Sequence, residues 1–292
     1  MEQLKTLLNT PTFFISLIGI IGLIVGSFLN VVIYRLPLMM QRAWQKECQE
    51  YLQIESSNST ELPSPFNLAL PLSHCPACNA AIKPYQNIPV LSYIFLKGKC
   101  ANCKASISLR YPAVEGLTAL TSIIVALHFG ATTATFLALI LTWALITLSF
   151  IDIDHQLLPD NITQPILWLG LFVSLFGIFT ETDASIIGTI AGYLSLWLVY
   201  HVFKLITGKE GMGYGDFKLL ALLGAWLGWH YLPLIILLSS LVGAVLGFSM
   251  IIYAKQDHNT PIPFGPYLAT AGWLALLWGD SLNQFYFSAF GL

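Results

Sequence analysis

Four of the five cysteines stand in two matched pairs, Cys75-Pro-Ala-Cys78 and Cys100-Ala-Asn-Cys103, with 21 residues between the pairs. Two residues inside a pair allow a tight turn to direct both sulfur atoms at one ion, and four thiolates complete the tetrahedral shell of a structural zinc site. Disulfides would need an oxidising compartment, and a redox-active site would need only one pair. The spacing therefore predicts a zinc site formed by Cys75, Cys78, Cys100 and Cys103.

Acidic residues stand at the ends of two apolar runs. The block FIDIDHQLLPD, residues 150–160, follows the third run, and the block GMGYGDFK, residues 211–218, precedes the sixth. Ionisable residues at a membrane boundary are costly and are functional candidates for that reason. Because two complete spans separate the blocks, Asp152 and Asp154 of the first block should face the same side of the membrane as Asp216 of the second.

Two carboxylates that share a proton can perform general acid–base chemistry, because one is driven to stay ionised and the other to stay protonated. Gly213 and Gly215 would let an extended substrate lie close to Asp216. The alternative for each aspartate is a solvated charge or a helix cap, which we favour for Asp154 and for Asp160 at the start of the next helix. The glycines do not follow a strand, so nucleotide binding is rejected.

The elements that carry these residues are membrane helices. The chain has 292 residues, of which 56% are apolar and 10% charged, with a mean hydropathy of +0.71. A soluble domain carries about 25% charged residues, so a water-soluble globule is excluded. No basic surface is concentrated enough for a nucleic-acid partner. The composition therefore indicates an integral membrane protein whose partners include membrane lipid.

The apolar runs predict an all-α polytopic membrane protein with about eight transmembrane helices. The runs are 13–34, 113–129, 134–151, 164–180, 186–206, two helices within 217–254, and 264–279. Twelve of the thirteen basic residues lie on one side, in the segments 35–112, 207–216 and 255–263 or in the adjoining ends of the spans. Basic residues stay in the cytoplasm, so the amino terminus should be periplasmic and the four-cysteine module, between the first two spans, cytoplasmic.

The ordered combination of motifs resembles the type IV prepilin peptidases, which are bifunctional leader peptidases and N-methyltransferases of the GxGD-type membrane aspartic proteases. The resemblance rests on the paired cysteine motifs, the FIDIDHQLLPD block, the GMGYGDFKLLALLGAW block of residues 211–226 and the PIPFGPYL stretch from Pro261. It covers nearly the whole chain from the first span onward.

The resemblance implies that the chain cleaves the basic leader from type IV prepilins and pseudopilins at the cytoplasmic face of the bacterial inner membrane. The new amino terminus would then be methylated with S-adenosylmethionine. By motif position, Asp152 and Asp216 correspond to the two catalytic aspartates of the family. Composition and spacing alone do not separate Asp152 from Asp154.

Three segments follow from this interpretation: a first transmembrane span (1–34), a cytoplasmic segment (35–112) with zinc knuckles at 75–103, and a membrane peptidase core (113–292). Zinc would organise the cytoplasmic segment, which we expect to contribute to the methyl-donor site. Two alternatives from other classes are a metal-ion transporter with a cytoplasmic thiolate sensor and a non-catalytic scaffold of pilus or secretion machinery. A transporter would place polar groups near mid-bilayer, whereas the acids here stand at span ends.

Overall fold

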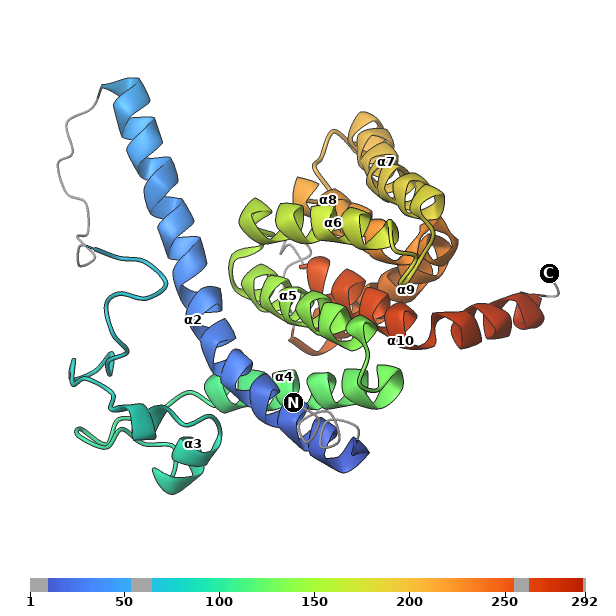
Figure 1. The fold of residues 1–292 in the computed structure, drawn as a ribbon. Helices are drawn as coiled ribbons and strands as arrows, with labels where there is room; N and C mark the ends of the chain where they lie inside the picture. The colour runs from blue at the N-terminus through green and yellow to red at the C-terminus, as the bar shows by residue number, and fades with distance from the viewer. Residues whose placement is uncertain (1–9, 54–64, 255–262, 291–292) are drawn as a thin grey trace. The chain divides into compact units, whose positions relative to one another are not determined.

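The computed structural model describes residues 10–53, 65–254 and 263–290, and these residues are almost entirely helical (Figure 1). No β-strand occurs within these ranges, which contain two isolated bridges, His74 with Ala81 and Lys99 with Ser106. The helices are α2 (Pro11–Leu52), α3 (Leu91–Phe95), α4 (Arg110–Phe129), α5 (Thr133–His155), α6 (Asp160–Ser174), α7 (Thr182–Thr207), α8 (Tyr214–Leu227), α9 (Leu232–Ala254) and α10 (Gly265–Phe290), with short 3₁₀ turns η1 (Pro84–Asn87) and η2 (Trp229–Tyr231). The all-α prediction is confirmed.

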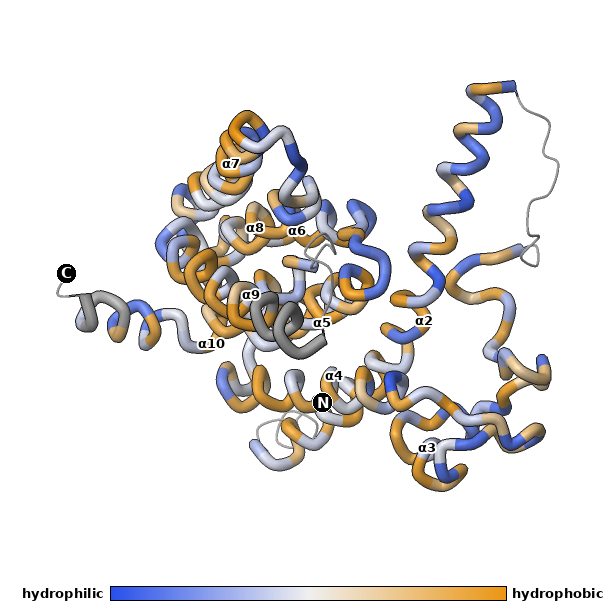
Figure 2. The backbone as a smooth tube through the Cα atoms, turned by 180° about the vertical axis from the view of Figure 1, so that it is seen from behind, coloured by the Kyte–Doolittle hydropathy of each residue, from blue (hydrophilic) through white to orange (hydrophobic). Residues whose placement is uncertain are grey.

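Each of the eight predicted helices corresponds to a helix of the structure, although α6 ends at Ser174, before the end of its apolar run, and the count of eight spans is not confirmed. Five helices among the described residues are long and apolar enough to cross a membrane: α2, α4, α5, α7 and the segment Trp229–Leu246. A span needs about 20 apolar residues, whereas α6 has 15 and α8 has 14. Figure 2 shows the apolar character of the helices and the hydrophilic second half of α2.

The chain forms two compact units, Met1–Thr135 and Phe136–Leu292. In the first unit, α2 packs closely on α4 because glycines of α2 face it. A Cβ at Gly22 would lie 2.8 Å from the Ala119 Cα, and one at Gly26 would lie 2.8 Å from the Glu115 Cα. Small residues of this kind let two membrane helices approach each other. The predicted first span therefore has a fixed helical partner.

Long-range polar contacts hold the segment between α2 and α4 to these two helices. The buried Arg35 guanidinium of α2 donates hydrogen bonds to the carbonyl oxygens of Asn67 (2.9 Å) and Pro71 (2.6 Å). The buried Glu115 carboxylate of α4 accepts a hydrogen bond from the Val90 backbone N–H at 2.7 Å. These contacts satisfy buried charges that would otherwise destabilise the fold.

In the second unit, the short helix α8 is the buried centre and packs against α6, α7 and α10 (Figure 1). Every residue from Leu219 to Leu227 is buried. A helix that is apolar all round is stable only when other helices surround it. The Trp226 indole N–H donates to the Ile166 carbonyl oxygen at 2.8 Å and fixes α8 against α6. Hydropathy alone cannot tell such a protein-enclosed helix from a lipid-exposed span.

The crossing of α7 and α8 depends on two glycines, Gly188 and Gly224. A Cβ at Gly224 would overlap the backbone carbonyl group of Gly188. We expect Gly224→Ala to lower the free energy of unfolding by about 3 kcal/mol, because backbone atoms cannot yield as a side chain does. Thermal unfolding in detergent measures the effect. The matched control is Gly116→Ala on α4, where no atom lies within 4 Å of the added Cβ; equal stability of the two variants would contradict the prediction.

Candidate functional site

Each cysteine pair lies in a short turn that closes its own backbone hydrogen bonds. The Cys75 N–H donates to the Ala80 carbonyl oxygen at 2.9 Å, and the Cys100 N–H donates to the Ala105 carbonyl oxygen at 2.8 Å. In both turns the residue after the second cysteine has a positive φ, 54° and 62°. The two turns therefore share one geometry, as their matched sequence spacing predicts.

The two turns bring four sulfur atoms together. The Sγ atoms all lie within 4.8 Å of one another, and those of Cys75 and Cys103 are 3.8 Å apart. A tetrahedral shell with metal–sulfur distances of about 2.3 Å has corners about 3.8 Å apart, whereas a disulfide bond is about 2.05 Å long. No disulfide joins any of the five cysteines. The group could therefore hold one metal ion; its members are Cys75, Cys78, Cys100 and Cys103.

Hydrogen bonds favour the thiolate form, which binds metals, at two of the four cysteines, Cys78 and Cys100. The backbone N–H groups of Cys103 and Asn102 lower the pKa of the Cys100 thiol to about 6. The Asn102 side-chain amide also lies 3.6 Å from the Cys78 Sγ, where it can donate to a thiolate. His74 is not a member of the sulfur group, and its ring Nδ1 contacts the Leu72 carbonyl oxygen instead.

Asp152 and Asp154, which the spacing does not separate, differ sharply in burial. Asp152, in the last turn of α5, is 6% exposed, whereas Asp154 is exposed. The Asp152 Oδ2 accepts a hydrogen bond from the backbone N–H of Gly265, 2.9 Å away at the start of α10. A buried carboxylate with a dedicated backbone donor is a better candidate for chemistry than a solvated one.

Asp216 lies in the first turn of α8, which is not among the five spanning helices, and is 7% exposed. Burial and the negative charge of Asp152 raise the pKa of the Asp216 carboxyl group. The pKa of Asp216 thus responds to the charge of Asp152, the other predicted site aspartate. Gly213, also predicted for this site, immediately precedes α8, and a Cβ on it would lie 3.8 Å from the Asp216 Oδ2.

Leu158, which the motif spacing did not single out, links the surroundings of the two aspartates. A Cβ at Gly215 would lie 2.8 Å from the Leu158 Cβ, and a Cβ at Gly265 would lie 3.2 Å from the Leu158 Cδ2. Leu158 is buried and belongs to the α5–α6 connection. One side chain therefore contacts both the glycine before Asp216 and the glycine bonded to Asp152. The signal in the sequence was its place inside the FIDIDHQLLPD block.

Asp160 is not the side-chain cap that its position before a helix predicted. The N-cap position of α6 is Pro159, without a side-chain cap, and Asp160 is already in the first helical turn. The Lys218 Nζ of α8 lies 2.7 Å and 2.8 Å from the two Asp160 carboxylate oxygens. The Asp160 carboxylate thus forms an ion pair that joins α6 to α8, at a position two residues after Asp216.

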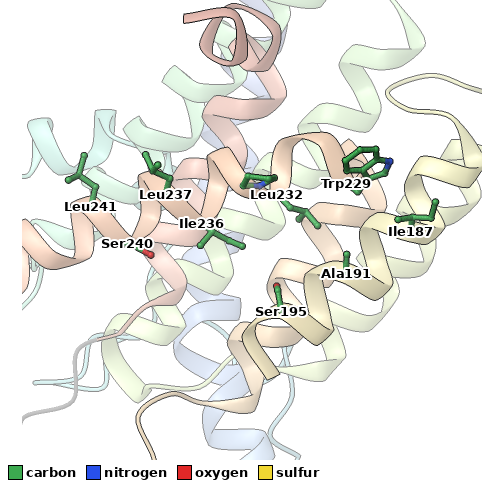
Figure 3. Close-up of a pocket in the computed structure, with 10 residues that line it drawn as sticks. Ile187, Ala191, Ser195, Trp229, Leu232, Ile236, Leu237, Ser240 and Leu241 are labelled. Atoms are coloured by element: carbon green, nitrogen blue, oxygen red, sulfur yellow. The ribbon is translucent and has the colours of Figure 1, made fainter. Parts of the chain in front are cut away.

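An apolar cavity of about 860 Å³ lies between α7 and the η2–α9 segment (Figure 3). Two serine hydroxyl groups and one indole are the polar groups of its lining, and neither aspartate takes part. The lining residues are Ile187, Ala191, Ser195, Trp229, Leu232, Pro233, Ile236, Leu237, Ser240 and Leu241. The cavity is thus distinct from the region that contains Asp152 and Asp216.

Similarity to known proteins extends over nearly the whole chain. Residues 20–129 match the family model described as the bacterial Peptidase A24 N-terminal domain, and residues 139–248 match that of the type IV leader peptidase family. A prepilin leader peptidase/N-methyltransferase from Stutzerimonas stutzeri is 54% identical over 286 residues, which are 98% of each chain. The chain belongs to the prepilin leader peptidase/N-methyltransferase family. A relative from Pseudomonas aeruginosa has the same identity and coverage, and one from Legionella pneumophila is 44% identical over 280 residues, 96% of each chain. No solved structure matches the chain.

Membership of the prepilin leader peptidase/N-methyltransferase family confirms the resemblance predicted from the motifs. The N-terminal match contains all four clustered cysteines, and the leader peptidase match contains both Asp152 and Asp216. The apolar helices show that this member of the family is a membrane protein.

Proposed function

We propose that this protein removes the leader from type IV prepilins and pseudopilins and then methylates the new terminal amine. The observation that carries the peptidase half is the pair of buried carboxylates, Asp152 and Asp216, at helix ends of one compact unit in a member of the leader peptidase family. A non-catalytic scaffold would need neither acid, and the match to the leader peptidase family favours a peptidase over a transporter.

The proposed peptidase step is a direct attack of water on the scissile carbonyl carbon. One aspartate removes a proton from the water, and the other donates a proton to the developing oxyanion. Collapse of the tetrahedral intermediate breaks the C–N bond: the leaving amine takes up the proton held by the first aspartate, and a hydroxyl group of the intermediate returns a proton to the second aspartate as the C=O bond re-forms. The apolar segment of the substrate stays in the bilayer, which fixes the peptide bond that reaches the two carboxylates.

For the metal site, we propose Zn²⁺, because four thiolates at tetrahedral spacing suit this soft-ligand ion. Its role is structural: four protein ligands leave no open position for a substrate or water. It would hold the two cysteine turns together and so order the part of the cytoplasmic segment 35–112 that contains them.

S-adenosylmethionine supplies the methyl group when bound. The described part of the first unit contains no β-strand, so a strand followed by a glycine loop does not hold the donor there. We assign the donor site to the cytoplasmic segment that the cysteine turns order. The proposed location is the bacterial inner membrane, with a periplasmic amino terminus and both reactions at the cytoplasmic face, because the basic residues lie on that side.

One assay tests both activities. Purified protein in lipid nanodiscs is mixed with a synthetic prepilin and S-adenosylmethionine labelled in its methyl group. We expect the substrate to lose the mass of its leader and the product to carry label on its amino terminus. If thermal unfolding shows that the protein is folded and the substrate still remains intact, the peptidase proposal is overturned. A cleaved but unlabelled product would overturn the methyltransferase half.

A further inference from the structure

The amino terminus of α10 is directed at Asp152. The first N–H groups of a helix have no partner within the helix. At this end of α10, Pro266 has no N–H, the Tyr267 N–H donates to the Phe264 carbonyl oxygen at 3.1 Å, and the Gly265 N–H donates to the Asp152 Oδ2 at 2.9 Å. Among residues 265–267, the Gly265 N–H is thus the one that donates to a side chain, the Asp152 carboxylate of α5.

This contact requires a residue without a side chain at position 265. A Cβ there would lie 2.7 Å from the Asp152 Oδ2 and 3.2 Å from both the Asp152 Cγ and the Leu158 Cδ2. Contacts under 3.0 Å force neighbouring atoms to move. Leu158 is itself buried, and its side chain packs beside the backbone of Gly215, so it has little room to move. Any side chain at 265 would therefore displace the Asp152 carboxylate.

The surroundings of the two aspartates favour opposite protonation states. A backbone N–H at a helix amino terminus stabilises a negative charge, through the hydrogen bond and through the helix dipole. Asp216 also accepts a backbone hydrogen bond, from Gly213 just before α8, but its burial and the facing charge of Asp152 outweigh that bond and raise its pKa. A buried carboxyl group beside a stabilised carboxylate retains its proton.

We propose that Gly265 is a positioning residue that keeps Asp152 ionised, so that Asp152 is the base toward water and Asp216 is the acid toward the carbonyl oxygen. This assignment rests on the proposed peptidase function and deepens it, because the paired carboxylates alone do not say which one holds the proton. It also makes α10 a third helix of the peptidase site, beside α5 and α8.

Few other charges act on Asp152. The charged residues of α8 are Asp216 and Lys218. Lys218 forms an ion pair with Asp160 of α6. The first two turns of α10, residues 265–272, contain no charged side chain. Their one titratable group, Tyr267, packs beside Gly243 of α9. Asp154 and His155, on α5 itself, are exposed.

The test compares Gly265→Ala with Gly272→Ala, a second crowded glycine of α10, where an added Cβ would instead meet the Leu223 side chain of α8. For Gly265→Ala we expect kcat to fall about tenfold with KM unchanged, and the acidic limb of the pH profile of kcat/KM to move up by about one pH unit, because hydrogen bonds to charged groups have about this strength. Gly272→Ala should lower thermal stability without moving the limb.

The isosteric variants Asp152→Asn and Asp216→Asn test the same assignment without changing α10. An amide at 216 can still donate a hydrogen bond to the carbonyl oxygen, whereas an amide at 152 cannot accept a proton from water. We therefore expect Asp216→Asn to retain about tenfold more residual cleavage than Asp152→Asn. The reverse order, or a folded Gly265→Ala variant with a wild-type pH profile, would overturn the inference. Wild-type cleavage by both asparagine variants would instead overturn the proposed peptidase function.

Discussion

Replacement of either buried aspartate by alanine should abolish leader cleavage while the protein remains inserted and folded. Asp152→Ala removes one partner of the proposed proton transfer and Asp216→Ala the other, and general acid–base groups contribute on the order of 10²–10⁴-fold to rate. We expect kcat for a synthetic prepilin to fall at least about 10³-fold in each variant. Mass spectrometry of the product over a time course measures the loss.

Asp154→Ala is the matched control, because Asp154 lies in the last turn of α5, as Asp152 does, but is exposed. We expect it to keep cleavage within about threefold of the wild type, as a solvated charge outside the proton-transfer path should. Normal leader removal by Asp152→Ala or by Asp216→Ala would contradict the peptidase assignment. A severe loss in Asp154→Ala, with Asp152→Ala active, would move the site two residues along α5.

Local features of this fold could be predicted from the sequence. Each cysteine turn closes its own hydrogen bonds within six residues, as that of Cys75 with Ala80 shows, so spacing alone defines its geometry. The apolar runs likewise predict helices because helical hydrogen bonds are local. What hydropathy could not reveal is what surrounds each helix: α8 is enclosed by protein rather than lipid, and it is too short to count as a span.

Features that depend on distant residues escaped the sequence analysis. The hydrogen bond between Gly265 and Asp152 joins residues 113 positions apart, and no periodic pattern encodes such a pair. The choice between Asp152 and Asp154 rested on family resemblance until burial distinguished them. Pro261 and Ile262 of the PIPFGPYL stretch lie outside the described residues, as do residues 54–64 of the polar segment between the first two predicted spans. The residue types of the candidate site could therefore be proposed from the sequence, whereas its arrangement depends on tertiary contacts.

Loss of one cysteine pair should remove the metal and, with it, methyl transfer. In the double variant Cys75→Ser/Cys78→Ser, two of the four sulfur ligands are gone, and a structural zinc ion contributes on the order of 10 kcal/mol to the folding of its module. We expect metal content, measured by atomic emission on purified protein, to fall from about one zinc per chain to none. Incorporation of labelled methyl groups should fall at least about tenfold more than leader cleavage, because Asp152 and Asp216 belong to the other compact unit.

The fifth cysteine provides the matched control. Cys48 is exposed on α2 and does not belong to the sulfur group, so Cys48→Ser should keep both the metal and methyl transfer. Cleavage by the double variant reports whether its second unit, which contains Asp152 and Asp216, is folded. Methyl incorporation at the wild-type rate by metal-free protein would show that the cysteine turns do not order the donor site. Equal loss of both activities in folded protein would mean that the metal supports the peptidase unit as well, because a module that served methylation alone would leave the chemistry of Asp152 and Asp216 intact.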